Sequence, residues 1–230
     1  FASILADDGQ EAAAKPTCIT TVAGYDLGLS HYLIGNDGDK VANPRHLVNA
    51  YRRLRRDSKA LFRKKPGSAN RRKARLRLAA QHERVANARA DFQHKLSRRI
   101  IDENQAVIVE TLKSANMMKN RRLARHIADA AWSGFVAKLA YKAESAGVHL
   151  VKLDQWFASS KTCHCCGHKM PDMPLRVWAW KCPGCSADHD RDINAAINIQ
   201  HKGITELMAA GHVVKAHRGL RKSGSMPVAA

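Results

Sequence analysis

The sequence predicts an α/β protein with a mixed sheet, a long basic helical hairpin and a zinc ribbon. Three observations carry this prediction. Short β-branched runs alternate with amphipathic helical patterns, 19 lysines and arginines gather in residues 45–99, and two Cys-x-x-Cys pairs lie further along the chain. Alternating strands and helices favour a sheet covered by helices, and paired cysteine knuckles at this spacing are typical of a zinc site.

The first part of the chain predicts a three-stranded meander. A β-branched run from Ile19 to Tyr25 ends at Asp26, and short apolar runs at residues 31–34 and 40–42 flank the turn sequence Asn36-Asp37-Gly38-Asp39. Asparagine, aspartate and glycine in such a turn are typical of β-hairpins. The pattern therefore places an aspartate in the first strand of the sheet.

Residues 46–63 and 69–101 predict two helices, separated by Pro66-Gly67-Ser68. Their apolar residues recur every seven positions and form a narrow stripe, so lysine and arginine cover most of the remaining surface. Residues 45–99 carry 19 Lys and Arg against three acidic residues, a net charge of +16 out of +19 for the chain. Such a block is typical of a surface that binds a polyanion, and the lack of an aromatic and leucine face favours nucleic acid over a membrane. A solvated hairpin whose charges only maintain solubility is the alternative.

The second half of the chain continues the α/β pattern. Residues 106–109 are a short apolar run that predicts a buried central strand, with Glu110 at its C-terminal end. Open α/β sheets gather ligands and catalytic groups at that edge. Residues 123–146 predict one amphipathic helix, because apolar residues fall four positions apart. A strand at 148–153 and a last helix that starts near Ile193 complete the pattern.

Two cysteine pairs, Cys163 with Cys166 and Cys182 with Cys185, are separated by 15 residues. Four thiolates at this spacing match a tetrahedral Zn²⁺ site, and four free thiols in a reduced core are the alternative. Cys165 lies inside the first pair and could compete as a ligand, but the two-residue spacing favours Cys163 with Cys166.

The surroundings of the cysteine pairs complete the predicted ribbon. Residues 175–180 read as a short strand between the two knuckles. We interpret His164, His168 and His189 as surface residues rather than ligands. Cys18 stands apart from the other cysteines, and we expect a buried small apolar side chain there.

Three acidic residues from distant parts of the chain, Asp26, Glu110 and Asp192, stand where predicted strands or helices begin or end. Mg²⁺ prefers oxygen ligands, and two such ions about 4 Å apart can activate a water and stabilise the leaving oxygen of a phosphodiester. The carboxylates therefore predict a magnesium site for phosphodiester hydrolysis. Each has an alternative role, because Asp26 could be a turn residue and Glu110 could pair with an arginine. Either Asp192 or Asp190 could be a helix N-cap, or Asp190 a further metal ligand.

Seven short motifs follow one another in order between residues 20 and 205. They are Gly24-Tyr25-Asp26-Leu27-Gly28-Leu29, Asn70-Arg71-Arg72-Lys73-Ala74-Arg75-Leu76, Val107-Ile108-Val109-Glu110, Asn120-Arg121-Arg122-Leu123-Ala124-Arg125, Ser159-Ser160-Lys161-Thr162-Cys163, Cys182-Pro183-Gly184-Cys185 and His189-Asp190-Arg191-Asp192-Ile193-Asn194-Ala195-Ala196. This collinear set resembles the transposon-encoded TnpB (OrfB) proteins, which are guide-RNA-directed nucleases related to the type V CRISPR effectors.

The resemblance implies an RNase H-like RuvC fold into which the zinc ribbon is inserted before the last acidic motif. It implies that Asp26, Glu110 and Asp192 are the Mg²⁺-binding catalytic acids, that DNA is the substrate and that a guide RNA is a partner. Family members often carry an aspartate where this chain has Thr111, and the family's N-terminal guide-handling region largely lacks a counterpart. We further expect seven basic residues to contact nucleic acid: Arg71, Arg72, Lys73, Arg75, Arg121, Arg122 and Arg191.

The expected organisation has five parts. They are a connector or the end of a preceding domain (1–16), the nuclease core (17–158) with the hairpin (46–101), the zinc ribbon (159–188), the last core helix (189–208) and a flexible tail (209–230). We hypothesise a metal-dependent DNA endonuclease core, with a non-catalytic zinc-ribbon remnant that binds nucleic acid as the alternative. We recognise no signal peptide and no long uncharged apolar run, so we expect a cytoplasmic protein of a bacterium or archaeon without a membrane span.

Overall fold

A five-stranded mixed sheet forms the centre of the computed structural model, which describes residues 9, 11–174 and 176–215. The strand order is β4-β3-β2-β5-β6. β2 and β4 pair antiparallel with β3, whereas β2, β5 and β6 run parallel. The predicted meander and central strand are confirmed. The strands are β2 (Val22–Leu27), β3 (His31–Gly35), β4 (Lys40–Ala42), β5 (Ala106–Glu110) and β6 (His149–Leu153).

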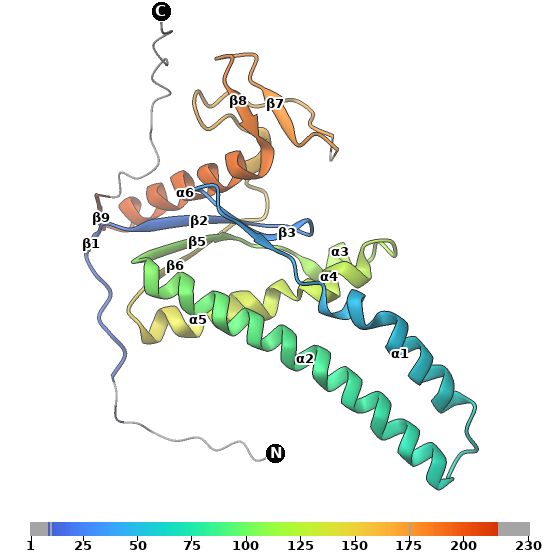
Figure 1. Cartoon of the computed structure of the whole chain (residues 1–230). Coiled ribbons are helices and arrows are strands. Elements are labelled where there is room, and N and C mark those ends of the chain that lie inside the picture. The colour runs from blue at the N-terminus through green and yellow to red at the C-terminus, as the bar shows by residue number, and fades with distance from the viewer. Residues whose placement is uncertain (1–8, 10, 175, 216–230) are drawn as a thin grey trace, which may run out of the picture.

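Helices cover both faces of this sheet (Figure 1). α6 (Arg191–Ala209) lies on one face, and α2 (Ala69–Glu103) and α5 (Trp132–Ser145) lie on the other. The alternation of side chains along β5 builds both cores. Val107 and Val109 pack against the α2 and α5 side, while Ile108 packs against Ile199 of α6. Burial on both faces explains why β5 is a continuous apolar run.

α6 approaches the sheet closely because two glycines leave room for it. A Cβ atom at Gly24 of β2 would lie 2.5 Å from the backbone nitrogen of Gln200, and one at Gly203 would lie 2.4 Å from Ile108. The Gln200 amide then donates a hydrogen bond of 2.8 Å to the Val22 carbonyl. These contacts fix α6 over β2 and so set where its first turn lies.

The helical hairpin of α1 (His46–Phe62) and α2 matches its predicted bounds within two residues. At about 1.5 Å per residue, the 35 residues of α2 span roughly 50 Å. Its buried residues begin only at Gln93. The earlier part of α2 lies along α1 and projects away from the sheet (Figure 1).

The single helix expected over residues 123–146 is wrong. The chain forms α4 (Ala124–Ala130) and α5, and Ala131 between them has a left-handed backbone with φ of 48°. The Gln93 amide donates hydrogen bonds to the carbonyls of Ala130 (3.2 Å) and Ala131 (3.1 Å) at this break. A buried side chain from α2 thus binds the backbone at the break, where Tyr32 also donates to the Ala130 carbonyl at 3.1 Å. A further short helix, α3 (Ser114–Met117), precedes them.

The break also lets α4 support the hairpin. Asp129 is 6% exposed, and its carboxylate accepts hydrogen bonds from the backbone N–H groups of Leu47 (2.8 Å) and Val48 (3.1 Å). N–H groups in the first turn of a helix have no partner within the helix. The residue before α1, Arg45, makes no side-chain cap that could supply one. Asp129 therefore caps α1 from a distant part of the chain.

Near the two ends of the described chain, β1 (Cys18–Ile19) and β9 (Val213–Val214) pair as a two-stranded parallel sheet. β9 lies within residues 209–230, for which we expected no regular structure; residues 216–230 lie outside the described part. Cys18 is exposed, so its expected burial is wrong. The neighbouring Ile19 takes the core-facing position of this strand at 0% exposure.

None of the helices in the described residues is long and apolar enough to cross a membrane.

The last module is the ribbon that carries the cysteine pairs. It contains the 3₁₀ turn η1 (Ser159–Lys161) and the antiparallel strands β7 (Ala179–Lys181) and β8 (Asp188–Asp190). The strand expected at residues 175–180 is shifted, and Leu175 lies outside the described residues. The ribbon sits above the start of α6 in Figure 1, directly before the helix in sequence.

Candidate metal centres and nucleic-acid surface

Asp26 and Glu110 end neighbouring parallel strands. β2 and β5 pair in a register that matches Tyr25 with Val109, so the two acids follow as the next residues at the same edge. Their carboxyl groups lie within hydrogen-bonding reach of each other, and one Glu110 oxygen accepts from the Leu27 N–H at 3.4 Å. Burial, and then the charge of Glu110, holds the pKa of Asp26 well above its usual range, and burial also raises the pKa of Glu110.

Asp192 lies in the first turn of α6, where it does not act as the cap. The N-cap is Asp190, whose carboxylate accepts hydrogen bonds from the backbone N–H groups of Asp192 (3.0 Å) and Ile193 (3.1 Å). Asp190 also forms an ion pair with Lys40 of β4. Of the two roles left open for these acids, the cap belongs to Asp190. The Asp192 carboxylate is therefore left for other contacts.

The three acids meet at one edge of the sheet. The charge of Asp192 contributes to the raised pKa of Asp26, and the pKa of Asp192 is itself raised, first by burial and then by Asp190. Among the described residues, the sets whose ligand atoms all lie within 4.8 Å of one another contain cysteine and histidine only. The three carboxylates thus lie close enough for their charges to interact, but their oxygen atoms are not all within 4.8 Å of one another. Divalent cations placed between them would stabilise their charged forms.

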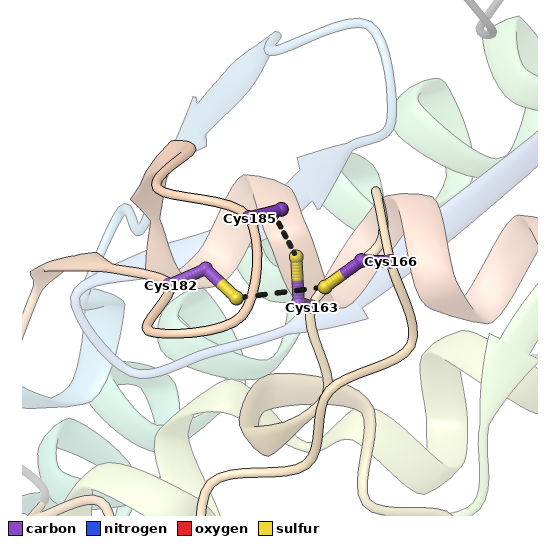
Figure 2. Close-up of side chains that lie close together, drawn as sticks. All are labelled: Cys163, Cys166, Cys182 and Cys185. Atoms are coloured by element: carbon purple, nitrogen blue, oxygen red, sulfur yellow. Dashed lines mark hydrogen bonds between the residues drawn. The ribbon is translucent and has the colours of Figure 1, made fainter.

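The four cysteines come together as predicted (Figure 2). The Sγ atoms of Cys163 and Cys185 are 3.7 Å apart, and those of Cys166 and Cys182 are 3.6 Å apart. Four thiolates at 2.3 Å from a tetrahedral zinc ion would be about 3.8 Å apart. The donor set and its spacing therefore fit Zn²⁺.

His189 corrects an expectation, because it is buried rather than at the surface. It is 4% exposed, and its Nε2 lies 3.1 Å from the Sγ of Cys163. Its ring packs against Trp180 and His164 at centroid distances of 4.6 and 4.8 Å. Burial, with the neighbouring His164, lowers the pKa of His189. Together with Cys163, the exposed Cys165 and His189 form a second close set of possible ligands.

Two asparagines that the sequence analysis missed attach the ribbon to α6. The Asn198 amide donates hydrogen bonds to the carbonyls of Ser159 (2.8 Å) and Thr162 (2.6 Å). Asn194 donates to Thr162 at 2.8 Å, and its Oδ1 accepts from the His164 N–H at 3.0 Å. Amides four residues apart on an otherwise apolar helix face are the signal that could have found them.

The predicted basic contacts divide into two groups. Arg71 turns back to its own hairpin, donating from Nη1 to the carbonyls of Leu61 (3.4 Å) and Lys64 (3.0 Å). Arg191 similarly donates to the Pro174 carbonyl at 3.4 Å. The side chains of the second group are exposed on α2 or in the turns before α4: Arg72, Lys73, Arg75, Arg121 and Arg122. Their contacts with nucleic acid stay a prediction.

Comparison with known proteins decides the family. Residues 7–121, half of the chain, match the family model OrfB_IS605, described as "Probable transposase", and residues 132–199 match the Cas12f1-like TNB domain. The chain belongs to the OrfB family. The expected resemblance is confirmed, and the second match covers the ribbon and the first half of α6.

Relatives of this OrfB chain include longer proteins. A Streptomyces pristinaespiralis protein named "Putative RNA-guided DNA endonuclease" is 41% identical over 229 residues, covering 99% of this chain and 56% of that protein. A Mycobacterium tuberculosis protein with the same description is 36% identical over 76% of this chain and 40% of its own length. The chain thus spans about half the length of the curated relatives it matches.

A solved structure shares the fold of this OrfB chain. The cryo-EM structure of a CRISPR-Cas12f ternary complex aligns with a TM-score of 0.57 over 86% of this chain and 41% of that chain, at 21% sequence identity. The predicted mixed α/β fold with a cysteine ribbon is confirmed by this likeness and by the cysteine cluster.

Proposed function

We propose that this chain is the nuclease core of an RNA-guided DNA endonuclease, with Asp26, Glu110 and Asp192 as the ligands of catalytic Mg²⁺. The observation that supports it most is the meeting of these acids from β2, β5 and α6, where burial raises the pKa of all three and the charges of Glu110 and Asp192 raise that of Asp26 further. Bound Mg²⁺ would supply the activation of water and the neutralisation of charge on the phosphodiester. DNA as substrate and a guide RNA as partner follow from the names of the relatives.

Each residue of the proposed site has a distinct task. Asp26 and Glu110 present paired carboxylates from a rigid sheet edge, and Asp190 fixes the first turn of α6 so that Asp192 faces them. Arg191 and the exposed arginines Arg121 and Arg122 would position backbone phosphates. Zn²⁺ held by the four cysteines would keep the ribbon folded, and the ribbon leads directly into α6.

Cleavage of labelled single-stranded DNA tests this function. The purified chain is incubated with the DNA and Mg²⁺, beside Asp26→Ala and the control Glu206→Gln, which changes an exposed acid of α6 that pairs with Lys202. We expect Mg²⁺-dependent cleavage by the chain and the control, and a loss of at least a hundredfold in Asp26→Ala. Salt-sensitive binding without cleavage would favour the non-catalytic alternative for this chain. Equal cleavage by Asp26→Ala would contradict the site.

A further inference from the structure

Phe62 is a large aromatic side chain that the proposed catalytic site does not use. It is the last residue of α1 and is 75% exposed, at the end of the hairpin that is farthest from the sheet (Figure 1). Exposed apolar side chains are ordinary when scattered over a surface, but this one ends a projecting arm whose residues 45–99 carry a net charge of +16. Its position therefore calls for a partner that accepts both an aromatic ring and positive charge.

The end of the hairpin holds Phe62 in a defined place. The Arg71 guanidinium donates to the carbonyls of Leu61 and Lys64 on either side of Phe62, at 3.4 and 3.0 Å. Ser68 caps α2 by accepting from the Arg71 N–H at 3.2 Å, and its hydroxyl donates to the Lys65 carbonyl at 2.8 Å. The connection between the helices is thus tied from both sides, which lowers the entropy cost of binding at its tip.

The residues next to Phe62 are positively charged. Arg63, Lys64 and Lys65 follow it directly and are exposed. The ion pairs of the hairpin within the described residues involve Arg56, Lys95, Arg98 and Arg99, so these three cations have no acidic partner there. A depression of about 340 Å³ at the same end is lined by further basic residues, Lys73 and Arg77, with Lys64 and Asp57. The tip combines an aromatic face with a surplus of cations.

We propose that the tip of the hairpin binds an unpaired nucleotide, with its base stacked on Phe62 and its neighbouring phosphates held by Arg63, Lys64 and Lys65. Nucleobases stack on aromatic side chains while cations track the backbone in proteins that bind single strands. A second copy of this chain would bring a like-charged tip against the first and be repelled. The inference rests on the proposed function only in taking nucleic acid as the partner.

Binding of oligonucleotides that contain 2-aminopurine tests the proposal without Mg²⁺, so that cleavage plays no part. Single-stranded DNA and single-stranded RNA are titrated separately, because either could supply the unpaired base. We expect Phe62→Ala to weaken binding of at least one of them roughly 5- to 150-fold, with the salt dependence of the affinity unchanged. We expect Lys64→Gln also to weaken binding, but to lower the magnitude of the slope of log K against log salt by about 0.7.

Matched variants separate stacking from loss of bulk. Phe62→Trp should keep the affinity and the change in 2-aminopurine fluorescence, whereas Phe62→Leu should lose both. Leu76→Ala removes another exposed apolar side chain of the same hairpin, 61% exposed, and should change neither. Equal affinity of Phe62→Ala and the parent chain for both strands would overturn the proposal, as would a Phe62→Ala effect on self-association in sedimentation without an effect on binding. Because no step requires catalysis, these results are independent of whether the chain cleaves DNA.

Discussion

The side-chain amide of Asn198 donates a hydrogen bond of 2.6 Å to the carbonyl of Thr162, the residue before Cys163 of the cysteine cluster. One helix therefore carries Asp192 at its start and holds the cysteine ribbon about two turns later. We infer that the ribbon and the acidic site are mechanically connected through α6.

Replacing Asn198 with alanine should loosen this connection. The carbonyls of Ser159 and Thr162 would lose a buried donor, so the free energy of unfolding should fall by about 1–3 kcal/mol in urea titrations. Thr205→Ala, which removes an exposed hydroxyl that bonds within the same helix, should change it by less than about 0.5 kcal/mol. Equal stability of the two variants would show that Asn198 does not hold the ribbon.

Removal of zinc should unfold the ribbon, because the thiolates of Cys163, Cys166, Cys182 and Cys185 would repel one another without an ion. A chelator should release one metal ion per chain, measured by elemental analysis, and expose residues 159–188 to protease. Cys163→Ser should prevent metal retention, while Cys165→Ser should retain one ion. Loss of metal in both Cys163→Ser and Cys165→Ser would instead favour the second ligand set, in which His189 is the third member.

Asp129→Ala should destabilise the hairpin, since the N–H groups of Leu47 and Val48 would lose their acceptor. We expect a loss of about 1–3 kcal/mol in the free energy of unfolding and faster proteolysis within α1. Asp129→Asn keeps an oxygen acceptor and should recover part of the loss. If Asp129→Ala left both measurements unchanged, the capping of α1 by Asp129 would be wrong.

Arg71 and Arg72 should behave differently although they are neighbours. Arg71→Gln removes the hydrogen bonds to Leu61 and Lys64, so it should reduce the free energy of unfolding by about 1 kcal/mol. Arg72→Gln should leave stability unchanged and lower the salt slope of single-strand binding by about 0.7. Denaturation and titration at several salt concentrations measure the two effects. The reverse pattern would contradict the assignment of Arg71 to the hairpin end.

Local patterns predicted most of the fold. The hairpin bounds followed from the spacing of apolar residues and from Pro66-Gly67-Ser68, and the cysteine cluster followed from its spacing alone. The break at Ala131 could not be predicted, because the four-residue apolar pattern runs through it and the Gln93 amide that binds there comes from 38 positions away. The burial of His189 depends similarly on Trp180 and Cys163 across the ribbon.

The sequence named the three candidate acids, but it did not show how they are arranged around one another. Sequence alone left the cap of α6 open between Asp190 and Asp192, and the hydrogen bonds of the first turn decide for Asp190. The pairing of Asp26 with Glu110 depends on the register of β2 and β5, which is fixed by side chains from both cores. The roles of the three acids in catalysis stay a proposal.

The central claim is that Asp26, Glu110 and Asp192 form one site for divalent cations, and Mn²⁺ binding measured by electron paramagnetic resonance tests it most directly. Mn²⁺ shares the oxygen preference of Mg²⁺, so the zinc-loaded ribbon should not compete. We expect binding to the parent chain and to Glu206→Gln, and at least tenfold weaker binding to Asp26→Asn, Glu110→Gln and Asp192→Asn. Unchanged Mn²⁺ affinity in Asp192→Asn would contradict the account, because α6 would then contribute no ligand to the site.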